Sequence, residues 1–129
     1  MSLKNHITVA KFPSSAIFDE LQHALASSEK ERRNAIEQAN ALLSFVLSNA
    51  AGETDSWHVD LRRTGRVGKG AGDNPTAVFL LSNEELGDLV SGRLSAETLF
   101  MAGKLRIKGD IVKTTVPEPL IKGPGSPKL

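Results

Sequence analysis

The spacing of apolar side chains changes near residue 41, and this change constrains the fold more than any other feature. Before it, apolar residues recur at the three- and four-residue steps of a helix, at Ile17, Phe18, Leu21 and Leu25. After it, alternate residues are apolar in 41–48 and again in 55–61, which is the period of a strand with one buried face. The pattern therefore predicts helices followed by an antiparallel hairpin with one face in water.

Capping serines and further apolar runs order the rest of the chain. Helix starts are expected at Ser14 or Ser15, Ser28, Ser82 and Ser95. Further strands are expected at 66–70, 76–81 and 104–108, and a last short helix at 111–116, before Pro117. This order is typical of an α+β domain, with one mostly antiparallel sheet and helices on one face. We expect one domain at 1–122 and a flexible, glycine- and proline-rich tail at 123–129.

The composition excludes several classes of function. The chain has no cysteine, which rules out disulfides and thiolate chemistry. Its 16 basic and 15 acidic residues give a net charge of +1, so no nucleic-acid partner is expected. No apolar run reaches the length of a membrane span, and the amino terminus lacks the apolar block of a secretory signal.

No catalytic set is expected. Ser56, His58 and Asp60 share one strand face, but side chains two residues apart lie about 6.5–7 Å apart and nearly parallel, too far for a catalytic triad. The glycine-rich run at 65–72 has only two residues between its first glycine and the Gly-Lys pair, where a phosphate loop needs four. The three histidines are not spaced as metal ligands, so neither a metal nor a cofactor is expected.

Three cations at 104–108 leave two interpretations open. Lys104, Arg106 and Lys108 share one face of the last strand, opposite Leu105 and Ile107. They form either an ordinary solvated face or a weak platform for anionic headgroups or the phosphate end of a ligand. The sequence does not distinguish between these two interpretations.

The pooled apolar residues of strands and helices indicate one interior. For such a set, a close-packed core is the default. Periodicity does not distinguish a packed core from a cavity, so the residues alone do not predict a ligand site.

Three stretches carry the pattern of a known family. They are LVSGRLSAETLFMAGKLRIKGD at 89–110, FLLSNEELGDL at 79–89 and TDSWHVDLRRTGRVGKG at 54–70. They resemble the sterol carrier protein two family, also called the sterol-transfer domain, and in particular its stand-alone fungal members. The resemblance covers about residues 15–116 in order.

This resemblance implies a five-stranded sheet with helices on one face that enclose an apolar lipid tunnel. It also implies non-enzymatic binding and transfer of fatty acids, fatty acyl-CoA and sterol-like lipids, with transient membrane contact and no cofactor. The residues that would line the tunnel are Leu21, Leu25, Phe45, Leu47, Val59, Phe79, Leu89, Val90, Phe100, Met101, Leu105, Ile107, Ile111 and Val112.

The chain departs from the family pattern at two places. Ala102 stands where many relatives have glutamine after the bulky pair, and Pro117 and Pro119 shorten the last helix. The final tripeptide, Pro127-Lys128-Leu129, resembles a variant of the Ser-Lys-Leu peroxisomal address. It predicts a peroxisomal location, reached through an import receptor that reads the tail.

Two rival functions stay open. One is an accessory or weak thioesterase-like enzyme that acts on bound acyl-CoA. The other is a packed interaction module without a cavity, which Val78 and Leu80 favour because they make the outer sheet face apolar.

Overall fold

The hairpin predicted from the alternating runs forms the centre of the sheet. In the computed structural model, which describes residues 7–109, β1 (Ala41–Ser48) pairs antiparallel with β2 (Thr54–Leu61). The other strands are β3 (Val67–Lys69), β4 (Ala77–Ser82) and β5 (Arg106–Gly109). The helical elements are η1 (Pro13–Ser15), α1 (Ala16–Ser27), α2 (Glu29–Ala39), α3 (Asn83–Ser91) and α4 (Ala96–Met101). The helix expected at 111–116 lies outside the described residues.

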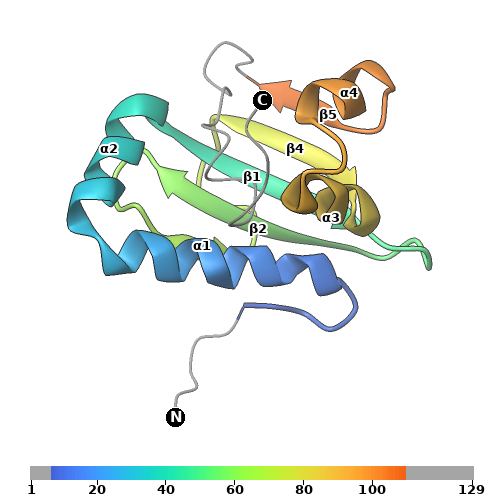
Figure 1. The fold of residues 1–129 in the computed structure, drawn as a ribbon, viewed down its shortest axis with the longest axis horizontal. Helices are drawn as coiled ribbons and strands as arrows, with labels where there is room; N and C mark the ends of the chain where they lie inside the picture. The colour runs from blue at the N-terminus through green and yellow to red at the C-terminus, as the bar shows by residue number, and fades with distance from the viewer. Residues whose placement is uncertain (1–6, 110–129) are drawn as a thin grey trace.

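The sheet has the strand order β3-β2-β1-β4-β5 (Figure 1). Every neighbouring pair is antiparallel except β1 and β4, which run parallel. After β3 the chain therefore crosses the sheet to reach the free side of β1. This confirms the predicted α+β class and its five-stranded, mostly antiparallel sheet.

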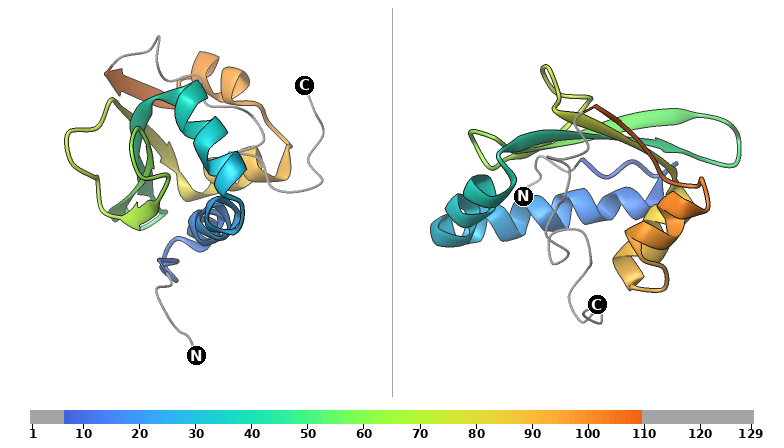
Figure 2. Two further views of the ribbon diagram at one scale, coloured as in Figure 1. Left: turned by 90° about the vertical axis from the view of Figure 1, so that its left-hand side faces the viewer. Right: turned by 90° about the horizontal axis from the view of Figure 1, so that it is seen from above.

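The described helices all lie on one face of the sheet, as Figure 2 shows in the view from above. We call this the inner face. α1 packs against η1, α2 and β3, while α3 packs against η1 and β4. In residues 7–109, no helix has both the length and the apolar character needed to cross a bilayer.

The helix starts follow the expected capping serines, with one exception. Ser82 Oγ accepts a hydrogen bond from the Glu85 N–H at 3.0 Å, and the Glu85 carboxylate accepts one from the Ser82 N–H at 2.9 Å. This reciprocal pair is a capping box. Ser15 occupies the cap position of α1 without capping it. Its hydroxyl instead accepts a hydrogen bond from the Val9 N–H at 3.0 Å, because the preceding segment folds back onto the helix start.

The outer face of the hairpin is less exposed than the alternation predicts. Leu42 and Ser44 are buried, although they point away from the helices. The loop after β3 lies against Leu42: a Cβ on Gly72 would stand 2.8 Å from a methyl carbon of that side chain. Thr76 then anchors the loop, since its N–H donates to the Leu42 carbonyl at 2.7 Å. The prediction of a wholly wet face is therefore wrong at this end of β1.

Asp60 organises the turn that follows β2. Its carboxylate accepts hydrogen bonds from the N–H groups of Arg62 and Arg63 and from the Thr64 hydroxyl, each at 2.9 Å. Partial burial alone would raise the pKa of Asp60, but these hydrogen bonds together hold it below its ordinary value of 3.8. The ionised carboxylate therefore stabilises the folded turn.

We expect D60N to lower the free energy of unfolding at pH 7 by about 1 kcal/mol, because the amide loses charge-assisted hydrogen bonds. Since folding lowers the pKa of Asp60, this stabilisation is fully present above the unfolded pKa and is lost as the pH falls through the folded one. Urea denaturation of wild type and D60N at pH 7 and at pH 3 measures the difference. D73N, at an exposed aspartate of the next loop, is the control. A D60N deficit equally large at both pH values would contradict this account.

Candidate functional site

The inner face of the sheet is a continuous apolar surface. The strand registers place Trp57, Phe45, Phe79 and Ile107 side by side in one row across β2, β1, β4 and β5. The first three are at most 7% exposed, and Ile107 is partly buried against the core. In the described part of the chain, the buried polar residues are Ser15 and Ser44, and Ser44 lies on the other face. Hydrocarbon can therefore lie against this surface without contacting a buried ionisable group of the described residues.

Five aromatic rings connect the amino-terminal segment to the sheet. Phe18 of α1 stacks on Trp57 with ring centroids 5.3 Å apart and also contacts Phe45 at 5.4 Å. Phe12 contacts Trp57 edge-on with ring centroids 5.8 Å apart, and Phe45 stacks on Phe79 with centroids 5.0 Å apart. These contacts fix α1 over β1 and β2.

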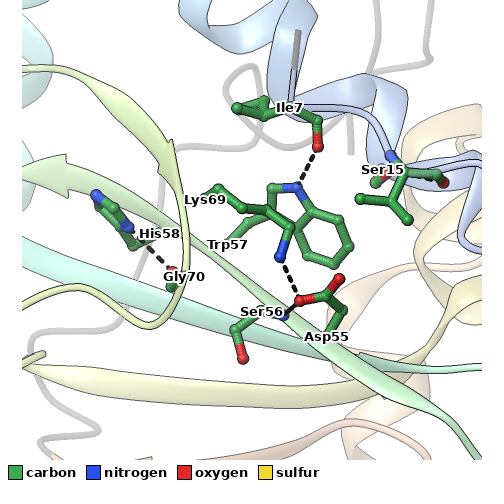
Figure 3. Close-up of polar contacts among 9 residues, drawn as sticks. Ile7, Ser15, Asp55, Ser56, Trp57, His58, Lys69 and Gly70 are labelled. Atoms are coloured by element: carbon green, nitrogen blue, oxygen red, sulfur yellow. Dashed lines mark hydrogen bonds and ion pairs between the residues drawn. The ribbon is translucent and has the colours of Figure 1, made fainter. Parts of the chain in front are cut away.

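Trp57 also ties down the segment that precedes η1. Its indole N–H donates to the Ile7 carbonyl at 2.7 Å (Figure 3). Lys69 lies over the indole, with Nζ 4.8 Å from the ring centroid, and forms an ion pair with Asp55. The hydrogen bond from Lys69, more than any other contact, holds the pKa of Asp55 below its ordinary value. The polar end of the tryptophan is thus satisfied at the edge of the apolar surface.

The predicted lining residues separate into three groups. The following are buried in the core: Leu25, Phe45, Leu47, Val59, Phe79, Leu89 and Leu105. Leu21, Val90 and Ile107 are partly buried and pack against it. Phe100 and Met101 are exposed, at 47% and 78%, while Ile111 and Val112 lie outside the described residues. The structure thus gathers ten of these side chains in one interior, and their role as a lipid lining stays a prediction.

The residues on the serine–histidine–aspartate face each have other partners. His58 Nδ1 lies 3.0 Å from the Gly70 carbonyl, so this nitrogen carries the proton (Figure 3). The Asp60 carboxylate is taken up by the turn after β2. The three side chains also lie on the outer face, away from the apolar surface. Among the described residues, no three potential ligands gather as a metal site.

A groove of about 460 Å³ lies at one end of the outer face. Val46 and Leu80 contribute apolar side chains, and Lys104 and Arg106 contribute cations. Glu85 also lines the groove. Sequence reasoning marked the cations and Leu80 but did not bring them together, because this contact depends on the pairing of β4 with β5, in which Arg106 lies opposite Leu80.

Comparison with known proteins decides what kind of domain this is. The model of the SCP-2 sterol transfer family matches residues 18–122. The chain belongs to the SCP-2 sterol transfer family. This confirms the resemblance seen in the three sequence stretches.

Individual relatives match nearly end to end. A fatty acid-binding protein of Yarrowia lipolytica is 41% identical over 128 residues, 95% of each chain. The oleate-induced peroxisomal protein POX18 of Candida maltosa is 31% identical over 118 residues, 90% of this chain and 92% of the relative. The solved structure of sterol carrier protein 2 from Yarrowia lipolytica, in its apo form, superposes with a TM-score of 0.82 at 36% identity, covering 89% of this chain and 94% of that one.

Sequence reasoning missed part of this SCP-2 interior. Phe12 is 2% exposed and contacts Trp57, yet the segment before Pro13 shows no period that would reveal it. The helical spacing of apolar residues places Phe18 on the apolar face of the helix but gives it no role at the site. Its spacing from Leu21 and Leu25 was the available signal, since all three share one side of α1.

We expect F18A to lower the free energy of unfolding by about 3–5 kcal/mol, because it removes a ring packed between Trp57 and Phe45. F100A is the matched control, with an expected loss below about 1 kcal/mol at a half-exposed ring. Urea denaturation of both variants measures the difference. Equal losses would show that the ring chain does not hold α1 to the sheet.

Proposed function

We propose that this SCP-2 domain binds one fatty acid, fatty acyl-CoA or sterol-like lipid and transfers it between membranes without a covalent reaction. The observation that carries the proposal is its alignment, over 95% of both chains, with a protein named for fatty acid binding. The apolar inner face supports it, because it offers a lipid tail a surface free of buried charge.

The energetics of hydrocarbon burial suit a carrier. Each methylene that leaves water contributes about 0.8 kcal/mol, so a sixteen-carbon chain gains on the order of 10 kcal/mol. A bilayer interior offers the chain a similar gain. Exchange between protein and membrane is then nearly balanced, which favours a shuttle or lipid buffer over a trap.

The proposed site lies over β4 and β5, beside the chain of aromatic rings. Phe79 and Ile107 lie side by side on the inner face of these strands. Leu89 and Leu105 belong to the same apolar cluster. Leu21 and Leu25 of α1 belong to the same apolar cluster. Val90 packs against the same cluster, and the expected lining residues Ile111 and Val112 lie outside the described residues.

Filling this space with a bulky side chain should block the ligand. We expect the wild type to bind a fluorescent fatty acid at about one per chain, displaced by unlabelled fatty acid or acyl-CoA. I107W, on the inner face of β5, should weaken binding at least tenfold, on the order of the loss of two buried methylenes. V78W, on the outer face of β4, is the matched control with unchanged affinity.

Mass spectrometry of lipid retained by the purified chain gives an independent measure of the ligand. Unchanged affinity in a folded I107W would move the site elsewhere. Absence of any saturable binding by the wild type would end the carrier proposal.

A thioesterase-like activity is the second candidate function, and the geometry disfavours it. His58 and Asp60 have partners outside any triad and face away from the proposed lipid site. The relatives that match end to end carry the names of a binding protein and a peroxisomal protein.

We expect any acyl-CoA hydrolysis by the wild type to stay at the uncatalysed rate, and H58A and D60A to leave it unchanged. A thiol-release assay with palmitoyl-CoA measures this. Hydrolysis above the uncatalysed rate that disappears in either variant would establish the enzyme instead. Both variants are checked for folding by circular dichroism, because Asp60 supports a turn.

We further propose a peroxisomal location. It is supported by the peroxisomal name of the Candida maltosa relative, which matches over 92% of its own length. The predicted address at Pro127, Lys128 and Leu129 lies outside the described residues, so its reading by an import receptor stays a prediction.

A further inference from the structure

The end of α4 exposes two large apolar side chains. Phe100 is 47% exposed and Met101 is 78% exposed, while their neighbour Leu99 is 1% exposed in the core. In the described part of the chain, the only other large apolar side chain classed as exposed is Leu94, at 36%. A neighbouring pair of this size at the end of a helix is unlike the single exposed residues scattered over ordinary surfaces.

Three cations follow this pair directly. Lys104, Arg106 and Lys108 are exposed, and none of them forms an ion pair with a described residue. Residues 100–109 contain these three cations and no acidic residue, in a chain whose total charge is only +1. Positive charge therefore follows the exposed apolar pair along the chain, and Arg106 and Lys108 project from the outer face of the edge strand β5.

Backbone hydrogen bonds hold the two groups together. The Gly103 N–H donates to the Phe100 carbonyl at 3.1 Å, and the Lys104 N–H donates to the Leu99 carbonyl at 2.9 Å. This tight turn keeps Lys104 beside the last turn of α4. Arg106 then pairs with Leu80 and, with Lys104, lines the groove on the outer face of the sheet.

The position of β5 at the sheet edge gives the cations an ordinary role. Charged side chains on an edge strand discourage pairing with another sheet. That role accounts for Arg106 and Lys108, whose strand has no neighbour on its far side within residues 7–109. It does not account for Phe100 and Met101, which precede the strand and would themselves promote association.

We propose that the α4–β5 surface, formed by Phe100, Met101, Lys104, Arg106 and Lys108, docks onto a bilayer that contains anionic phospholipid. The apolar pair enters the interface between headgroups and acyl chains, and the cations contact the anionic headgroups. The purpose of this contact, delivery of a lipid, rests on the proposed carrier function, whereas the contact itself does not. We favour a lipid surface as the partner because apolar and cationic side chains are adjacent in this part of the chain, whereas the whole chain has a net charge of only +1.

Vesicle sedimentation tests the cations. We expect the wild type to bind vesicles of phosphatidylcholine with phosphatidylserine, and to bind them less as salt rises. K104Q/R106Q/K108Q should lower this partitioning by about fivefold per charge, on the order of 100-fold in all. K30Q/R63Q/R66Q is the matched control, since it removes three exposed, unpaired cations from α2 and the segment after β2. α2 lies at the other end of the molecule from α4 (Figure 1).

The apolar pair is tested in the same assay. F100S/M101S should lower partitioning about tenfold or more, while L94S, at the exposed leucine before α4, should leave it unchanged. Equal losses in a test variant and its control would overturn the proposal, as would full vesicle binding by both test variants. A loss of fatty acid affinity in F100S/M101S with unchanged vesicle binding would also overturn it, and would instead return these side chains to the tunnel lining.

Fatty acid binding in solution separates this proposal from the carrier function. K104Q/R106Q/K108Q should bind a fluorescent fatty acid as the wild type does, because its substitutions lie outside the apolar interior. If the wild type binds vesicles through this surface but takes up no fatty acid, the carrier proposal fails and the docking surface stands. If it binds fatty acid and no variant alters vesicle binding, the docking surface fails and the carrier stands.

Discussion

The stacking of Phe18 on Trp57 determines how the rest of the domain is arranged. Phe18 comes from α1 and Trp57 from β2, and the two rings lie nearly parallel with an interplanar angle of 9°. Around them, Phe12 and Phe45 extend the contact to the amino-terminal segment and the central strand. Ring packing thereby fixes α1 over β1 and β2, while α3 packs against β4.

The parallel pairing of β1 with β4 gives the sheet its two unlike faces. It places Phe79 beside Phe45 on the inner face and Leu80 beside Val46 on the outer face. The connection from β3 to β4 crosses the outer face, where it packs against the buried Leu42. The outer face is therefore partly closed at one end and grooved at the other, and a purely antiparallel hairpin would produce neither feature.

Local patterns predicted the elements well because each records burial within a few residues. The run 41–48 is a strand at the bounds that its alternation gave, and Ser82 with Glu85 fixed the start of α3. The failures involve contacts between distant parts of the chain. The Ser15 hydroxyl accepts a hydrogen bond from the Val9 N–H instead of capping α1, and Phe12 is buried where it contacts Trp57. Apolar period also cannot tell a packed core from a lined cavity, so the lipid site came from the family resemblance alone.

The residues of the short helix α4 match the family pattern, but that pattern does not determine how deeply each of them is buried. Successive residues of a helix turn by about 100°, so once Leu99 faces the core, Phe100 and Met101 point progressively away from it. Their exposures of 1%, 47% and 78% follow this rotation. This helix of six residues buries Leu99 alone. Their bulk therefore adds little to the stability of the described fold, which is why a role at a boundary between protein and lipid explains them better than a role in packing.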